Sequence, residues 1–334
     1  MVSAVIFVAT SCVSPLTGFA FWETNLAYEG ESIYNYLQVK NLSDRTILST
    51  NVLFGVQSVT MKDKGLTGMY YDTALAAPAL ADNANSALIL GMGTGTYARQ
   101  LKQYYPKMNI TGVEIDQKIT DLAGEYFDEP ADIPVTTYDG RAWLAASHDK
   151  YDVIMVDAYQ DITIPFQMSS TEFFTMVREH LNPGGVMVVN MNMISDGQGS
   201  INEALSDTIA SVFGNGNTLT ADVPNTTNRE LFAKKPGSGS EENSMQQASK
   251  ALNLRETTYE RTGSEDLEWY MEEVASRFRK VNEPDSASTI LTDDKAPVEV
   301  LGMHAIDQIS ADEAGPYRQI LKDEGFGGLL RAVQ

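Results

Sequence analysis

From residue 87 onward, short apolar runs alternate with segments whose apolar residues recur at helical spacing. These short runs predict strands at 87–90, 109–114, 135–137, 153–157 and 186–190. The segments between and after them predict helices at 97–105, 117–126, 141–146, 171–180 and 201–213. Alternation of this kind indicates an α/β fold, a parallel sheet with helices on both faces.

Glycine and proline mark where several of these elements end. Residues 182–185 (Asn-Pro-Gly-Gly) predict a turn between a helix and the next strand. Residues 218–222 and 229–233 predict a hairpin that closes the sheet. The composition of 234–243 predicts a flexible surface segment. Residues 267–281 predict an amphipathic helix, and we interpret its stripe of Leu267, Tyr270, Met271, Val274 and Phe278 as core packing.

The part before residue 73 has a different pattern. Aromatic and β-branched residues at 34–39, 46–50 and 55–59, separated by turn residues, predict a small antiparallel sheet. The alanine-rich stretch 71–80 predicts a helix. We therefore expect an apolar segment at 1–22, a β-rich domain at 23–72, a Rossmann-like domain at 73–305 and a tail at 306–334.

Residues 1–22 carry no charged side chain. About 20 apolar residues can span a bilayer, but hydroxyl residues, Pro15 and Gly18 dilute this run, and no basic residue precedes it as in a secretory signal. It could be a weak anchor, the end of a larger membrane segment or a buried strand. We favour membrane association with the catalytic domain in the cytoplasm; the alternative is a wholly cytoplasmic protein.

The amino-acid composition limits the classes of ligand that the protein is expected to bind. Lys and Arg number 24 against 45 Asp and Glu, a formal net charge of −21, which argues against nucleic acid and favours cationic small molecules. Cys12 is the single cysteine, so no internal disulfide can form. His148, His180 and His304 lack zinc-ligand spacing, so no metal is expected.

Four acidic or glycine-rich motifs lie where successive predicted strands end: 88–96, 113–116, 138–140 and 151–157. Ligands bind at this edge of an open α/β sheet. Gly91, Gly93 and Gly95 would let a backbone approach a ligand, next to a helix N-terminus. The pattern G-x-G-x-x-G is not met, because the third glycine comes one residue early. A cofactor with adenosine but without pyrophosphate is therefore favoured.

Carboxylates at the strand ends extend this site. Glu114 can accept hydrogen bonds from ribose hydroxyls, and Asp116 reads as a helix N-cap. Asp139 can accept from an adenine amine, while Gly140 leaves space for the ring. Asp139 could also be an N-cap; we favour the ligand role, since Glu114 sits at the matching edge.

Asp157 follows an apolar strand beside this site, where a carboxylate can serve as a base or as an ammonium anchor. Gln160 and Asp161 lie in the next loop, and such loops often cover a substrate. Tyr70 and Tyr71 could line the pocket, because aromatic faces attract ammonium groups. For Tyr70 we favour ordinary core packing.

Together these residues resemble the polyamine aminopropyltransferases, the spermidine synthase family, and in particular the bacterial spermidine synthase-like domains joined to membrane segments. The resemblance covers roughly residues 28–301. Besides the four motifs, it rests on the segments 55–59 (Gly-Val-Gln-Ser-Val), 66–72 (Leu-Thr-Gly-Met-Tyr-Tyr-Asp) and 291–299 (Leu-Thr-Asp-Asp-Lys-Ala-Pro-Val-Glu).

The resemblance implies an N-terminal β-domain, a class I methyltransferase-type Rossmann-like domain and a homodimer. It implies decarboxylated S-adenosylmethionine as donor and putrescine or a similar amine as acceptor. Glu114 would hold the ribose and Asp139 the adenine. Asp157 would orient and deprotonate the amine, with Tyr71 flanking it. Gln57 would lie near the donor.

Two positions depart from the family pattern. Thr94 replaces the Asp that anchors the ammonium of the donor's propyl chain, and Gln160 replaces a second loop acid, for which Asp161 could substitute. The alternatives are therefore an S-adenosylmethionine-dependent methyltransferase, which needs no acid at Thr94, and a non-catalytic paralogue that binds polyamines or nucleosides.

Overall fold

The computed structural model describes residues 23–303, except 52–55, 64, 159–163, 193–196, 198, 238–244 and 246–248, together with Lys322. The apolar segment 1–22 and, apart from Lys322, the predicted C-terminal tail lie outside the described residues. Among the helices that the structure describes, none is long and apolar enough to cross a membrane.

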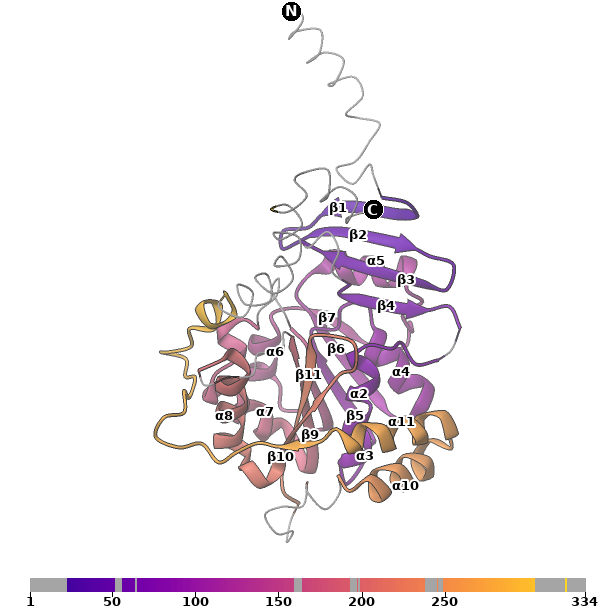
Figure 1. Cartoon of the computed structure of the whole chain (residues 1–334). Helices are drawn as coiled ribbons and strands as arrows, with labels where there is room; N and C mark the ends of the chain where they lie inside the picture. Colours follow the sequence, from indigo (N-terminus) through magenta and orange to yellow (C-terminus); the bar gives the residue numbers. More distant parts are fainter. Residues whose placement is uncertain are drawn as a thin grey trace, which may run out of the picture.

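The N-terminal sheet is antiparallel and has the order β1 (Leu26–Glu31), β2 (Tyr36–Asn41), β3 (Arg45–Thr50) and β4 (Ser58–Met61). Figure 1 shows it stacked on one end of the larger domain, over α5 (Gln117–Tyr126). Leu37, Val39 and Leu48 are buried there against Ile119 and Leu122 of α5. Burial of this apolar face therefore fixes the small sheet on the larger domain.

The larger sheet has eight strands in the order β12-β10-β11-β9-β8-β5-β6-β7. The parallel strands are β5 (Ser86–Leu90), β6 (Asn109–Glu114), β7 (Val135–Thr137), β8 (Tyr151–Val156) and β9 (Leu181–Asn192). The predicted hairpin is present as β10 (Thr218–Asp222) and β11 (Asn228–Lys234), which joins β9 antiparallel. These findings confirm the α/β fold preceded by a small antiparallel sheet.

Helices cover both faces of this sheet (Figure 1), and each face has its own apolar core. One face carries α2 (Tyr70–Ala74), α3 (Ala76–Leu80), α4 (Thr96–Tyr104), α10 (Ala251–Thr262) and α11 (Glu265–Ser276). The other carries α6 (Gly140–Ala146), α7 (Thr171–His180) and α8 (Ile201–Phe213). Two short 3-10 turns, η2 (Phe166–Met168) and η3 (Asn215–Asn217), connect elements of the domain.

The single helix predicted at 71–80 is instead two short helices that meet at Leu75. Pro78 has no backbone N–H, so it cannot bond the carbonyl of Ala74 four residues earlier. The hydroxyl of Tyr97, on α4, donates to that carbonyl at 3.1 Å instead. The interruption is thus satisfied by a residue distant in sequence.

Three further predictions need correction. The turn predicted at 182–185 lies inside β9: Tyr151 pairs with Leu181 and Val153 with Val186, so the four residues between form a bulge. Lys234, predicted in a flexible segment, is buried in β11, and its Nζ lies 2.8 Å from Asp82 Oδ1.

The helix predicted at 267–281 ends at Ser276, and β12 (Arg279–Lys280) then pairs with β10. The predicted stripe does pack in the core, although Phe278 lies beyond the end of the helix.

Candidate active site

A cavity of about 350 Å³ opens at the carboxyl ends of β5, β6, β7 and β8. This is the edge where an open α/β sheet binds ligands. Residues from the N-terminal sheet, including Tyr34, Asn35 and Leu48, close one side of it. The structure brings these predicted site residues to its lining: Gln57, Tyr71, Gly91, Gly93, Glu114, Asp139, Gly140 and Asp157.

The loop after β5 bends through glycines that adopt left-handed backbone conformations. Gly91 has φ +88°, and a Cβ placed there would lie 2.4 Å from the carbonyl oxygen of Asp157. Gly93 has φ +56°, and its N–H donates to Glu114 Oε2 at 2.8 Å. Only glycine fits the first position without a shift of backbone. The loop can therefore lie directly against the backbone that follows β8.

Gly95 and Thr94 do not line this cavity. Gly95, with φ +78°, is the N-cap of α4. Thr94 is fully buried, and its Oγ1 has no hydrogen-bond partner among the described residues. The prediction that these two residues bind the cofactor therefore gains no support from the cavity, although both shape the turn that carries Gly93.

Glu114, at the end of β6, is buried, and both of its carboxylate oxygens accept backbone hydrogen bonds. Oε2 accepts from Gly93 and Oε1 accepts from the N–H of Asp116 at 3.0 Å. Burial raises the pKa of Glu114, and these two backbone donors partly oppose the shift. A carboxylate has about four lone-pair sites, so Glu114 can still accept a hydrogen bond from a ribose hydroxyl.

Asp139 and Asp116 both cap helices. Asp139 Oδ1 accepts from the N–H of Ala142 at 2.8 Å, so the N-cap alternative is correct in geometry, while the residue also lines the cavity. Asp116 caps α5 through Lys118. Its Oδ2 also accepts from Ser32 at 2.5 Å and from Asn35 at 3.1 Å. Asp116 therefore holds the N-terminal sheet against the edge of the cavity.

Asp157 lies at the base of the cavity, immediately after β8, with both carboxylate oxygens held. Oδ2 accepts from the Tyr70 hydroxyl at 2.7 Å, and Oδ1 accepts from Asn190 Nδ2 at 2.9 Å. Burial raises the pKa of Asp157 to about 7, although these two hydrogen bonds favour the charged form. A carboxyl with this pKa can exchange a proton near neutral pH.

Tyr70 and Tyr71 stack beside this carboxylate, with ring centroids 4.0 Å apart. Tyr70 is packed in the core, as the favoured interpretation predicted, and it also lines the cavity, as the alternative predicted; its contact with Asp157 was not predicted. Tyr71 donates its hydroxyl to the carbonyl of Gln57 at 2.8 Å. The pair therefore joins Asp157 to the segment that enters β4.

Sequence reasoning also missed a polar row on β9 and β11. Asn228 Nδ2 donates to Asn190 Oδ1 at 2.9 Å, and Asn190 in turn donates to Asp157. Glu230, opposite Asn190 in the register, is fully buried, and neither carboxylate oxygen has a hydrogen-bond partner among the described residues. Burial raises its pKa well above the usual value, and Asp157 adds to the shift. The sequence held one signal for this row: the strand predicted at 186–190 ends on a polar residue, Asn190, at the edge where the site lies.

Gln160 and Asp161, predicted to contact the amine, lie outside the described residues. The chain resumes at Ile164, and Pro165, Gln167 and Met168 then line the cavity.

The parallel sheet, its antiparallel hairpin and the cavity at the strand ends define a Rossmann-like protein of the class I methyltransferase type. Residues 69–235 match the family described as "Spermine/spermidine synthase domain". Over all 334 residues the chain is 99% identical to a Bifidobacterium longum protein named "Probable polyamine aminopropyl transferase", and it spans 75% of that protein. The chain therefore belongs to the spermine/spermidine synthase family, as predicted.

Solved structures agree on the fold. A probable spermidine synthase from Corynebacterium glutamicum is 22% identical with a TM-score of 0.57, over 80% of this chain and 99% of that one. A spermidine synthase in complex with the transition state analogue AdoDATO is 18% identical with a TM-score of 0.54, over 64% of this chain and 75% of that one.

Proposed function

We propose that the chain is an aminopropyltransferase that moves an aminopropyl group from decarboxylated S-adenosylmethionine to a diamine such as putrescine. The observation that carries the proposal is Asp157, a partly buried carboxyl with a pKa of about 7 that lines a cavity suited to a nucleoside. The name of the 99% identical relative, a probable polyamine aminopropyl transferase, supports the same reaction.

The cavity fits the nucleoside part of such a donor. Its volume of about 350 Å³ lies within the range of small-molecule sites. Glu114 offers lone pairs to ribose hydroxyls, and Asp139 offers its carboxylate to the adenine amine. Gly91 and Gly93 line the cavity with backbone alone, which leaves space for a ligand beside them. The donor would bring a sulfonium, whose sulfur is a good leaving group.

Asp157 supplies what the acceptor needs. Alkylamines such as lysine have a pKa near 10.4, so the acceptor arrives protonated and cannot attack. Asp157 takes this proton, and the amine lone pair then forms the C–N bond to the propyl carbon next to sulfur. The C–S bond breaks, its electron pair goes to sulfur, and neutral methylthioadenosine leaves. Tyr70 and Asn190 keep the carboxylate in place throughout.

One observation favours a second candidate, methyl transfer from S-adenosylmethionine. Thr94 is neutral and does not line the cavity, so it offers no negative charge to the ammonium of a decarboxylated donor. A donor that retains its carboxylate does not require an acid there.

Product analysis separates the candidates. The protein is incubated with each donor and a panel of amines, and the products are identified by mass spectrometry. Aminopropyl transfer yields methylthioadenosine and an amine extended by one aminopropyl group. Methyl transfer yields S-adenosylhomocysteine, and a non-catalytic paralogue yields neither. Absence of methylthioadenosine with every amine would refute the proposed reaction.

A further inference from the structure

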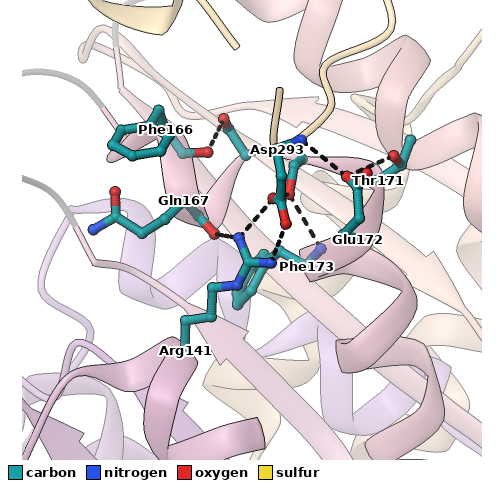
Figure 2. Close-up of polar contacts among 9 residues, drawn as sticks. Arg141, Phe166, Gln167, Thr171, Glu172, Phe173 and Asp293 are labelled. Atoms are coloured by element: carbon teal, nitrogen blue, oxygen red, sulfur yellow. Dashed lines mark hydrogen bonds and ion pairs between the residues drawn. The ribbon is translucent and has the colours of Figure 1, made fainter. Parts of the chain in front are cut away.

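An ion-paired cluster joins the C-terminal part of the chain to the wall of the cavity (Figure 2). Its centre is Asp293, in the segment 291–299 that the sequence singled out and that the site described above does not use. The cluster brings together α6, the turn η2, the start of α7 and this distant segment.

Arg141 grips Asp293 with two parallel hydrogen bonds. Its Nη1 lies 2.7 Å from Asp293 Oδ1, and its Nη2 lies 2.6 Å from Oδ2. The same Nη1 also donates to the carbonyl of Gln167 at 2.7 Å. This planar two-point geometry fixes orientation as well as distance, which a lysine could not do.

Asp293 is itself held on the α7 side, as Figure 2 shows. Ser170, the N-cap of α7, donates its hydroxyl to Asp293 Oδ1, and the N–H of Asp293 donates to Glu172 Oε2 at 3.1 Å. The N–H of Thr171 donates to the carbonyl of Leu291 at 2.9 Å. Asp293 therefore acts as a fixed point to which Arg141 attaches.

Arg141 touches two walls of the cavity. Asp139 and Gly140, which line it, directly precede Arg141 in the chain, and Gln167, whose carbonyl Arg141 contacts, lines it from η2. Met168 packs against the start of α6, since a Cβ on Gly140 would lie 3.6 Å from its Cε, in ordinary van der Waals contact. The width of the cavity on this side therefore depends on how Arg141 is held.

We propose that Asp293 is a positioning residue for the nucleoside: through Arg141 it sets the spacing between the start of α6 and the η2 wall. The inference rests on the proposed function, because it assigns the nucleoside part of the donor to this side. Arg141 also lowers the pKa of Asp293, so the pair stays ionised at neutral pH.

The expected effect is on binding more than on stability. The Asp293 side chain is 39% exposed, and exposed ion pairs contribute little to folding. Loss of a constraint on a binding wall should instead weaken nucleoside binding; we expect about tenfold, within the range of coupling between two distinct sites. A residue with a purely structural role would instead lower the melting temperature and leave the affinity of the folded protein unchanged.

The test is the dissociation constant of methylthioadenosine, measured by calorimetry on the full chain together with the melting temperature. The variants are Asp293→Asn, Arg141→Gln, their double mutant and Arg141→Lys, which keeps the charge but loses the two-point geometry. Asp294→Asn is the matched control, because it removes the neighbouring exposed carboxylate.

We expect each single variant, Arg141→Lys included, to bind about tenfold more weakly, and the double mutant no more weakly than the worse single, since both remove one interaction. Asp294→Asn should bind as the unmodified chain does. Variants of Asp293 and Arg141 that all bind within twofold of the unmodified chain overturn the inference alone. An unmodified chain that binds no methylthioadenosine overturns the proposed function, and the inference with it.

Discussion

The chemistry of Asp157 is set by its surroundings. Burial opposes its charge, while Tyr70 and Asn190 each donate to one carboxylate oxygen and favour that charge. The balance is a pKa of about 7, so the group can accept a proton near neutral pH and release it after the reaction.

The pH dependence of kcat/KM should show this ionisation. Only the charged form of Asp157 can accept the proton of the amine, so kcat/KM should fall below about pH 7. A bound ammonium favours the charged carboxylate, so the corresponding limb of kcat should lie at lower pH. Initial rates between pH 5 and 9 check both limbs; a kcat/KM that is unchanged down to pH 5 would contradict this role.

The same residue should make folding pH-dependent. Because its pKa is raised from 3.8 to about 7 in the folded state, its contribution is most favourable below about pH 4 and is lost as the pH rises through 7. Between pH 5 and 8 the loss is about 3 kcal/mol at 1.36 kcal/mol per pKa unit. Urea unfolding of the unmodified chain and Asp157→Asn at both pH values should show that difference. Parallel changes in the two proteins would rule it out.

At the scale of elements, the loop after β5 depends on Gly91. Gly91→Ala should abolish nucleoside binding and lower the free energy of unfolding by about 2 kcal/mol or more, because a Cβ there meets the backbone of Asp157 at positive φ. Gly124→Ala is the control. Gly124 lies in α5, and a Cβ there would meet no atom within 4 Å, so the substitution should leave the free energy of unfolding unchanged or raise it slightly. Calorimetry and urea unfolding measure both effects. Retained nucleoside affinity in Gly91→Ala would contradict this account of the loop.

Most elements of the larger domain could be predicted because their periodicity is local. The misses depend on distant partners. The break at Leu75 needs Tyr97 to satisfy a carbonyl, and the bulge at 182–185 depends on pairing with β8. Helix α10 was not predicted. Its apolar residues are not gathered on one face of the helix, so the periodicity of the sequence gave no signal for it.

Site residues could be predicted from the sequence where they lie at the ends of strands. Glu114, Asp139 and Asp157 line one cavity because the carboxyl ends of parallel strands share an edge. The hydrogen bonds of Tyr70 and Asn190 to Asp157 could not be predicted, because they depend on how α2, β8 and β9 pack together. The raised pKa of Asp157 depends on its burial by this packing, so it could not be predicted from the sequence either.

At the scale of the whole molecule, the net charge of −21 should attract a cationic acceptor. Salt screens such attraction, with a Debye length of about 10 Å at 0.1 M. The KM for putrescine should therefore rise severalfold between about 0.02 and 0.5 M salt, while the affinity for neutral methylthioadenosine changes little. Initial rates and calorimetry across this range test the idea, and a KM for putrescine independent of salt would exclude such steering.

The central claim is that Asp157 serves as the base in aminopropyl transfer within a nucleoside cavity. The most direct measurement is the rate of methylthioadenosine release from decarboxylated S-adenosylmethionine and putrescine, by the unmodified chain and by Asp157→Asn. Methylthioadenosine binding is measured in parallel. Loss of a general base slows a reaction by roughly 10²–10⁴-fold. We predict a loss of about this size in Asp157→Asn, with nucleoside affinity within about threefold of the unmodified chain. Equal release rates in the two proteins would contradict the account.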